Sequence, residues 1–264
     1  MIRGLFIPFC LTFLAPTLAF AQAVSFLDIT DSEFEDITKE FSGNFMHHSV
    51  QGASPLGDIF GFEIGLVGGQ QGTPKIDTLA KRAGGSGISN LYHAGLLGAV
   101  SIPFGITGEV VLLPKMSASE AELSMTSLAL KLSLNTELLK VIPFNLAFRG
   151  FQTNSKFSFK QAIAGYGDAA VEDKSTVTGF QLMASPKLPI VEPYAGVGIL
   201  NAENELSSSV GSVFADGSSS KEKSLSATQM LLGINVNLLF FRLGAEYSSA
   251  FGANSITGKL AFGF

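Results

Sequence analysis

The sequence predicts an all-β membrane protein: an antiparallel up-and-down transmembrane β-barrel of about ten strands (about eight to twelve), preceded by a short amphipathic helix. Two observations support this prediction. From residue 56 almost to the C-terminus, apolar and polar residues alternate with a period of two, and the connections between the alternating segments are long and short in turn. A helix cannot produce this alternation, because its side chains repeat with a period near 3.6.

The first residues have the pattern of an export signal. Arg3 precedes a short apolar stretch at 5–14, and two cleavage sites of the small-x-small type lie within 19–23. We therefore expect residues 1–23 to be a cleaved signal peptide. The only cysteine, Cys10, is lost with it, which excludes a disulfide scaffold and a thiolate metal site in the mature chain.

The composition excludes several function classes. The 264 residues include 17 Lys and Arg against 22 Asp and Glu, a formal net charge of -5, so no basic surface attracts nucleic acid. A hydrophobic fraction of 46% excludes a disordered chain, and 29 glycines with 23 phenylalanines are typical of a β-rich protein with many turns.

A helix is predicted after the signal. Ser32 and Glu35 have the spacing of a capping box, so the helix is expected to begin at Ser32. An apolar stripe with helical spacing follows, at Phe34, Ile37, Phe41 and Phe45. We expect residues 24–55 to form a periplasmic or lumen-facing helical segment, and one hypothesis is that its helix closes the periplasmic mouth. A helix on a partner, on a membrane surface or on the rest of the protein remains an alternative.

Residues 56–264 are expected to form the barrel. Alternation is strongest in six segments, at 60–67, 127–134, 142–149, 229–238, 241–247 and 259–264. Weaker strands are predicted at 91–102, 106–113, 177–184 and 191–200. Each has about the 9 to 11 residues that cross a bilayer at a tilt, and no mature segment is a spanning helix.

The connections favour a barrel over a soluble secreted β-sandwich binding protein, which alternation alone would also fit. Long polar connections are predicted at 68–89, 114–122, 151–175 and 201–224. Tight connections are predicted at 103–105, 135–141, 187–189 and 239–240. Turns on one side of a membrane and loops on the other give this order.

Charged residues of both signs fall on the polar face of the predicted strands. They are Glu63, Glu109, Lys131, Arg149, Arg242, Glu246 and Lys259. If the strands close into a barrel, these side chains share one lumen, where we expect them to pair into a network that blocks the lumen rather than conducts.

The C-terminal residues add a resemblance. Leu260, Phe262 and the terminal Phe264 alternate, and together with the export signal and the strand pattern they resemble a Gram-negative outer-membrane β-barrel protein. In such proteins these positions are the signal for the barrel-assembly machinery, although Lys259 stands where a glycine is usual. The resemblance implies outer-membrane lipid as surroundings and both termini in the periplasm. Residues 57–63 and 93–98 are similar to an uncharacterised proteobacterial barrel family, which implies no known activity.

Catalytic signals are weak. Three histidines are present, His47, His48 and His93. Ser86, Ser89 and Glu120 could approach His93 near the outer rim, but no spacing is diagnostic of a triad. We therefore assign no catalytic, metal-binding or cofactor-binding residue. The sequence predicts a passive transport role for a small or hydrophobic molecule, or a structural or surface role, with an outer-membrane lipid-modifying enzyme as the alternative.

Overall fold

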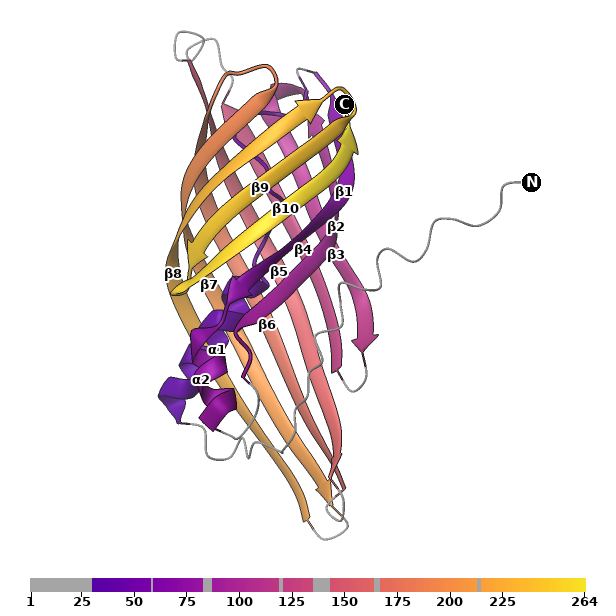
Figure 1. Cartoon of the computed structure of the whole chain (residues 1–264), viewed down its shortest axis with the longest axis vertical. Coiled ribbons are helices and arrows are strands. Elements are labelled where there is room, and N and C mark those ends of the chain that lie inside the picture. Colours follow the sequence, from indigo (N-terminus) through magenta and orange to yellow (C-terminus); the bar gives the residue numbers. More distant parts are fainter. Residues whose placement is uncertain are drawn as a thin grey trace, which may run out of the picture.

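The computed structural model describes residues 30–57, 59–82, 87–118, 121–134, 143–163, 167–212 and 215–264. The predicted signal peptide at 1–23, the turn at 135–141, and Ser86 and Glu120 lie outside these residues. Within them the chain forms a closed antiparallel β-barrel of ten strands, so the predicted fold class is confirmed (Figure 1).

Each strand pairs with its neighbour in the sequence, and β1 pairs with β10 to close the barrel. The strands are β1 Gly61–Gly72, β2 Asn90–Ile102, β3 Ile106–Ala118, β4 Ala121–Leu134, β5 Phe144–Ile163, β6 Gly167–Pro186, β7 Val191–Ser212, β8 Ala215–Leu238, β9 Phe241–Ala250 and β10 Ala253–Gly263. Closure leaves no open sheet edge, which is what a sheet in hydrocarbon requires.

The alternating pattern places apolar side chains outside the barrel. On β4, Leu128, Leu130 and Leu132 are 59%, 62% and 42% exposed, whereas Ser127 and Lys131 at the alternate positions are fully buried. Burial alternates in the same way along the whole of β10. An apolar exterior around a polar interior is the arrangement of a membrane barrel and the reverse of a soluble β-sandwich, so the sandwich alternative is not favoured.

The strands differ in length, and this corrects the prediction of three long loops, since the described residues of 114–122 belong to β3 and β4. The polar stretches at 151–175 and 201–224 are expected as loops but belong largely to β5–β6 and β7–β8, which run as paired hairpins of 20 to 24 residues per strand. Alternation of hydrophobicity ends where an apolar face is no longer needed, but main-chain pairing continues. These hairpins extend one end of the barrel, which we call the hairpin end (Figure 1).

The opposite end carries tight turns and the C-terminus, and we call it the C-terminal end (Figure 1). The turn between β2 and β3 is a 3₁₀ turn at Pro103–Gly105. Gly105 has φ +75°, and a Cβ there would lie 2.2 Å from the carbonyl oxygen of Ser133. Only glycine fits this turn, since it alone adopts positive φ without steric cost and has no Cβ.

Two α-helices of the described residues lie at the hairpin end. Helix α1 spans Asp31–Asn44 and is capped by Thr30 in a capping box with Glu33. The predicted cap, Ser32 with Glu35, is therefore wrong by two residues, and Glu35 instead pairs with Lys39 and Lys223.

Helix α2, Pro74–Arg82, lies in the β1–β2 connection and was not predicted. Among the described residues, no helix has the length and apolarity to cross a membrane.

The position of α1 corrects a second prediction. We expected the helix at the same end as the C-terminus, but α1 contacts α2 at the far end of β1, whereas Phe264 bonds to Phe62 near the start of β1 (Figure 1). The described chain therefore begins and ends at opposite ends of the barrel. The segment that joins α1 to β1 must cross the interior.

Candidate functional site

Residues 45–56, which we call the plug, pass through the barrel lumen. The plug has no regular secondary structure, and its side-chain and main-chain groups form hydrogen bonds with residues of every strand. In strand order these residues are Glu63, Ser101, Glu109, Ser127 and Lys131, Asn145 and Arg149, Ser185, Glu192, Gln229, Arg242 and Thr257. A segment bonded to all ten strands lies along the barrel axis.

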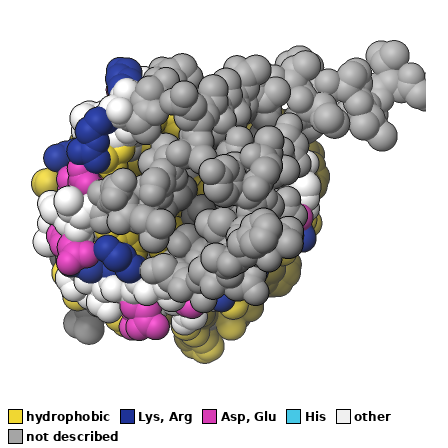
Figure 2. Space-filling model, turned by 90° about the horizontal axis from the view of Figure 1, so that it is seen from below, with side chains coloured by type: hydrophobic (Ala, Val, Ile, Leu, Met, Phe, Trp, Pro, Cys, Tyr) yellow, Lys and Arg dark blue, Asp and Glu magenta, His cyan; other side chains and the backbone are white. Residues whose placement is uncertain are grey.

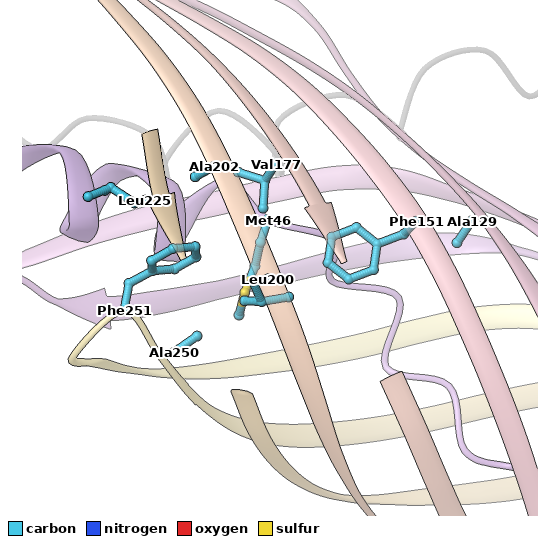
Figure 3. Packing of buried hydrophobic residues seen from close by; sticks show 9 residues of the cluster. All are labelled: Met46, Ala129, Phe151, Val177, Leu200, Ala202, Leu225, Ala250 and Phe251. Atoms are coloured by element: carbon cyan, nitrogen blue, oxygen red, sulfur yellow. The ribbon is translucent and has the colours of Figure 1, made fainter. Parts of the chain in front are cut away.

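Toward the hairpin end the plug is held by apolar contacts. Phe45 belongs to one buried cluster, with wall residues such as Val111. Met46 belongs to a second cluster and lies among Phe151 and Leu200 (Figure 3). Burying a side chain of this size contributes about 1.5–3 kcal/mol, so these two residues anchor this part of the plug.

The middle of the lumen is organised around the carboxylate of Glu109 on β3. Its Oε2 atom lies 3.0 Å from Nε2 of His47 and 3.4 Å from Nη1 of Arg149, and its Oε1 atom lies 3.9 Å from Nζ of Lys131. Arg149 also donates a hydrogen bond of 2.8 Å to Oγ of Ser49. The plug thus contributes His47 and Ser49 to a fully buried network. In this network the Glu109 carboxylate lies near both wall cations, Arg149 and Lys131.

A second carboxylate, Glu63 on β1, lies nearer the C-terminal end. It is 2.9 Å from Nζ of Lys259 and 3.3 Å from Nη1 of Arg242. It also accepts a hydrogen bond of 3.1 Å from the amide of Gln51 in the plug. This centre repeats the first one: a wall carboxylate between two wall cations, with a plug side chain attached.

The structure places all seven lumen charges named from the sequence on the inner wall. Six of them form the Glu109 and Glu63 centres, and the seventh, Glu246, accepts a hydrogen bond of 2.8 Å from Tyr194. Sequence reasoning missed Glu192, which accepts hydrogen bonds from Ser185 and from the main chain of Ser54. Glu192 precedes Pro193 at the start of β7, where the alternation is blurred, although it has the same inward parity as Tyr194.

The structure also brings together a serine, a histidine and a carboxylate that the sequence did not connect. Oγ of Ser127 lies 2.8 Å from Nδ1 of His47, whose Nε2 faces Glu109. The set resembles a hydrolytic triad in composition, but His47 and Glu109 side chains are fully buried and Ser127 also bonds to Thr153. Because His47 belongs to the plug, any movement that admitted a substrate would remove the base. We interpret the set as an anchor for the plug.

His93 faces the lumen rather than an outer rim. Its ring stacks on that of His48 in the plug, with centroids 4.1 Å apart, and its nitrogens bond to Asn44 and Thr257. Ser89, which we expected near it, instead bonds to Asp77 at the end of the β1–β2 connection. The three histidines therefore join the plug to the wall. Among the described residues, no group of three or more His, Cys, Asp or Glu side chains could hold a metal ion.

Helix α1 is fastened at the hairpin end by exposed ion pairs. Glu33 pairs with Arg82 of α2, and Glu35 lies 2.7 Å from Lys223 of β8. Charged side chains of both signs lie side by side along the rim at this end (Figure 2). Glu40 adds a partly buried contact, since its carboxylate accepts the Lys75 and Ile76 main-chain N–H groups at 2.9 Å and caps α2.

These ion pairs predict an acid-sensitive attachment of α1 to α2 and β8. The hydrogen bond from Arg82 lowers the pKa of Glu33 to about 2, and the hydrogen bond from Lys223 lowers the pKa of Glu35 to about 2, from a usual 4.5. A lowered pKa means that the contact is complete above pH 4.5 and is lost as the pH falls toward 2. Spin labels on Ser32→Cys and Thr78→Cys are expected to keep one distance at neutral pH and to separate within this acid range. Separation already between pH 7 and 5 would contradict the assignment.

The three residues of the C-terminal signal lie outside the barrel. Leu260, Phe262 and Phe264 are 54%, 48% and 57% exposed. Phe264 contacts Phe62 edge to face, with ring centroids 4.6 Å apart, beside the seam between β1 and β10. An exposed row of apolar side chains on the last strand is accessible before and after that seam closes.

Comparisons with known proteins give one family and several solved structures to which this chain is similar. A model of the family described as "Family of unknown function (DUF6588)" matches residues 9–264. The chain is similar to the outer-membrane protease OmpT of Escherichia coli, with 12% identity, 78% of this chain and 97% of that chain covered, and a TM-score of 0.46. It is similar to the translocator domain of the autotransporter NalP of Neisseria meningitidis, with 10% identity, coverage of 88% and 95%, and a TM-score of 0.45. No curated protein matches the sequence.

Proposed function

The chain belongs to the DUF6588 family, and we propose that it is a non-enzymatic outer-membrane barrel for passive transport whose lumen is closed at rest by its own plug. The observation that carries the proposal is the path of residues 45–56, which bond to every strand of the wall. The plug is not a strand of the barrel, so it can move without opening the ladder of strand pairing that a membrane barrel requires.

The wall that surrounds the plug supports transport over a purely structural role. A structural barrel of this size needs only wall side chains to fill it. Here several wall positions beside the plug are small: Gly244 faces Val50, and a Cβ added to Gly244 would lie 2.8 Å from the Val50 side chain. Removal of the plug would therefore leave a passage, apolar around Phe45 and Met46 and polar beyond them. A small solute with an apolar part fits the two halves of this passage.

A closed structural barrel is the second candidate. The observation that favours it is the complete burial of His47, Glu109 and Lys131, which ties the plug to the wall through charged groups. Breaking such contacts costs several kcal/mol, so spontaneous opening would be rare.

A reversible disulfide between the plug and the wall distinguishes the transport barrel from the closed structural barrel. Val50→Cys with Gly244→Cys places two thiols within disulfide reach inside the lumen, and Cys10 is the only other cysteine of the sequence. In planar bilayers we expect the reduced full chain to show brief openings and the oxidised chain to show none, because the plug cannot leave.

The matched control is Val50→Cys with Gly258→Cys. Gly258 adjoins Lys259, the partner of Gly244 in the β9–β10 ladder, but it is exposed on the outer face. This pair cannot cross-link, so oxidation should leave its openings unchanged. A folded chain that never opens in either redox state would refute transport and favour the structural candidate.

A further inference from the structure

Near the C-terminal end, charged side chains of the lumen wall bind the main chain of the plug. Nζ of Lys131 donates to the carbonyl oxygens of Gly52 and Ser54 at 2.9 and 3.0 Å. Nη2 of Arg242 donates to the carbonyl oxygen of Leu56 at 2.9 Å. Two wall cations thus bind the carbonyl groups of every second residue from 52 to 56.

The main-chain N–H groups of the same segment also bond to the wall. The N–H of Ser54 donates to Oε1 of Glu192 at 2.9 Å, and the N–H of Leu56 donates to Oγ of Ser101 at 3.0 Å. Glu192 and Ser101 are buried and are themselves bonded to wall hydroxyls, so their positions are fixed. The wall therefore offers cations to carbonyl groups and acceptors to N–H groups.

The side chains of this part of the plug are small, and the one polar side chain, that of Ser54, accepts a hydrogen bond of 2.8 Å from Asn145 and lies 3.5 Å from Oγ of Ser185. Residues 52–55 are Gly, Ala, Ser and Pro. A Cβ added to Gly52 would lie 2.3 Å from the Glu192 carboxylate, so this position admits no side chain unless Glu192 moves. The site therefore accepts a chain with small residues at the positions of 52–55 and binds its main-chain carbonyl and N–H groups.

We propose that Lys131, Glu192, Arg242 and Ser101 form a binding site for a peptide main chain, and that a short peptide rich in small residues is the solute that exchanges with the plug. This inference rests on the proposed function, because the site is free only when the plug leaves it. Main-chain recognition distinguishes a peptide from a sugar or a hydrocarbon, neither of which presents alternating carbonyl and N–H groups at peptide spacing.

Competition with the plug in the full chain tests the proposal. Val50→Cys is buried beside the wall and reacts with a membrane-impermeant maleimide only when the plug leaves the lumen. A synthetic peptide with the sequence of residues 45–56, at millimolar concentration to match the tethered plug, is expected to raise the labelling rate about tenfold and to saturate. A peptide in which residues 53 and 54 exchange places, so that the proline stays at 55 and both N–H donors remain, should compete nearly as well.

The decisive control is the same peptide N-methylated at the residues that correspond to Ser54 and Leu56, which keeps every side chain and removes both donors. We expect it to compete about tenfold less well or worse. Equal competition by the methylated peptide, or by a maltooligosaccharide of similar length, would overturn the peptide site. Neither result bears on the channel openings of the reduced Val50→Cys, Gly244→Cys chain. The peptide site can therefore fail while the proposed transport function stands.

Discussion

Deletion of residues 31–56 is expected to convert the protein into a steady open pore. The deletion removes α1 and the plug but none of the ten strands, all of which begin at Gly61 or later. The lumen then loses Phe45, Met46 and the His47 contacts, and a passage lined by Glu63, Glu109 and the wall cations fills with water. Single-channel recording should show long conducting steps where the full chain shows brief ones.

A shorter deletion of residues 31–44 is the matched control. It removes α1 with its ion pairs to Arg82 and Lys223 but keeps the plug and the Glu109 network. We expect it to conduct far less than the longer deletion, because the plug rather than the helix fills the lumen. A folded barrel that remains silent without residues 31–56 would show that the wall closes itself.

Glu109→Gln is expected to give the largest loss of stability of any single change in the lumen. The substitution leaves the Arg149 and Lys131 cations buried and removes the carboxylate that lies near both. Loss of one partner of a buried ion pair costs about 3–5 kcal/mol, because the remaining charge is uncompensated. Denaturant titration in detergent micelles, followed by the shift in gel mobility on unfolding, measures the free energy of unfolding.

The control for this prediction is Glu122→Gln. Glu122 also pairs with a lysine, at 2.9 Å from Nζ of Lys115, but this pair lies near the hairpin end with both side chains partly exposed. An exposed pair contributes about 0–1 kcal/mol, so this change should be nearly neutral. Equal losses in the two variants would contradict the central role of Glu109.

The barrel could be predicted from the sequence because each strand carries its own local signal. The alternation at 127–134 is that of β4, and the alternation at 259–264 is that of the end of β10. The long hairpins were not predicted, because outside an apolar environment strand pairing needs no alternation. Helix α2 was missed since its nine residues carry no stripe of buried apolar side chains, and its cap comes from Glu40 on another element.

The alternation of side chains along each strand was enough to assign the wall charges to the lumen. It did not identify the residues with which they pair. The alternation of side chains shows that Glu109 and Arg149 point inward, but their direct contact depends on barrel closure, and their contacts with His47 and Ser49 depend on the path of residues 45–56. That path has no periodic signal, because an irregular segment obeys no helical or strand spacing. Its one local signal is the apolar Phe45, which we interpreted as the last residue of the apolar stripe of the predicted helix.

The central claim is that residues 45–56 occupy the lumen of the folded barrel in a membrane. The most direct measurement is the yield of disulfide in outer-membrane preparations of the full chain with Val50→Cys paired with Gly244→Cys or with Gly258→Cys. The two glycines lie at the same height on adjacent strands and face opposite sides of the wall. The structure predicts efficient cross-linking to position 244 and none to position 258. Absence of cross-linking to position 244 in a folded, heat-modifiable barrel would place the plug elsewhere and contradict the account.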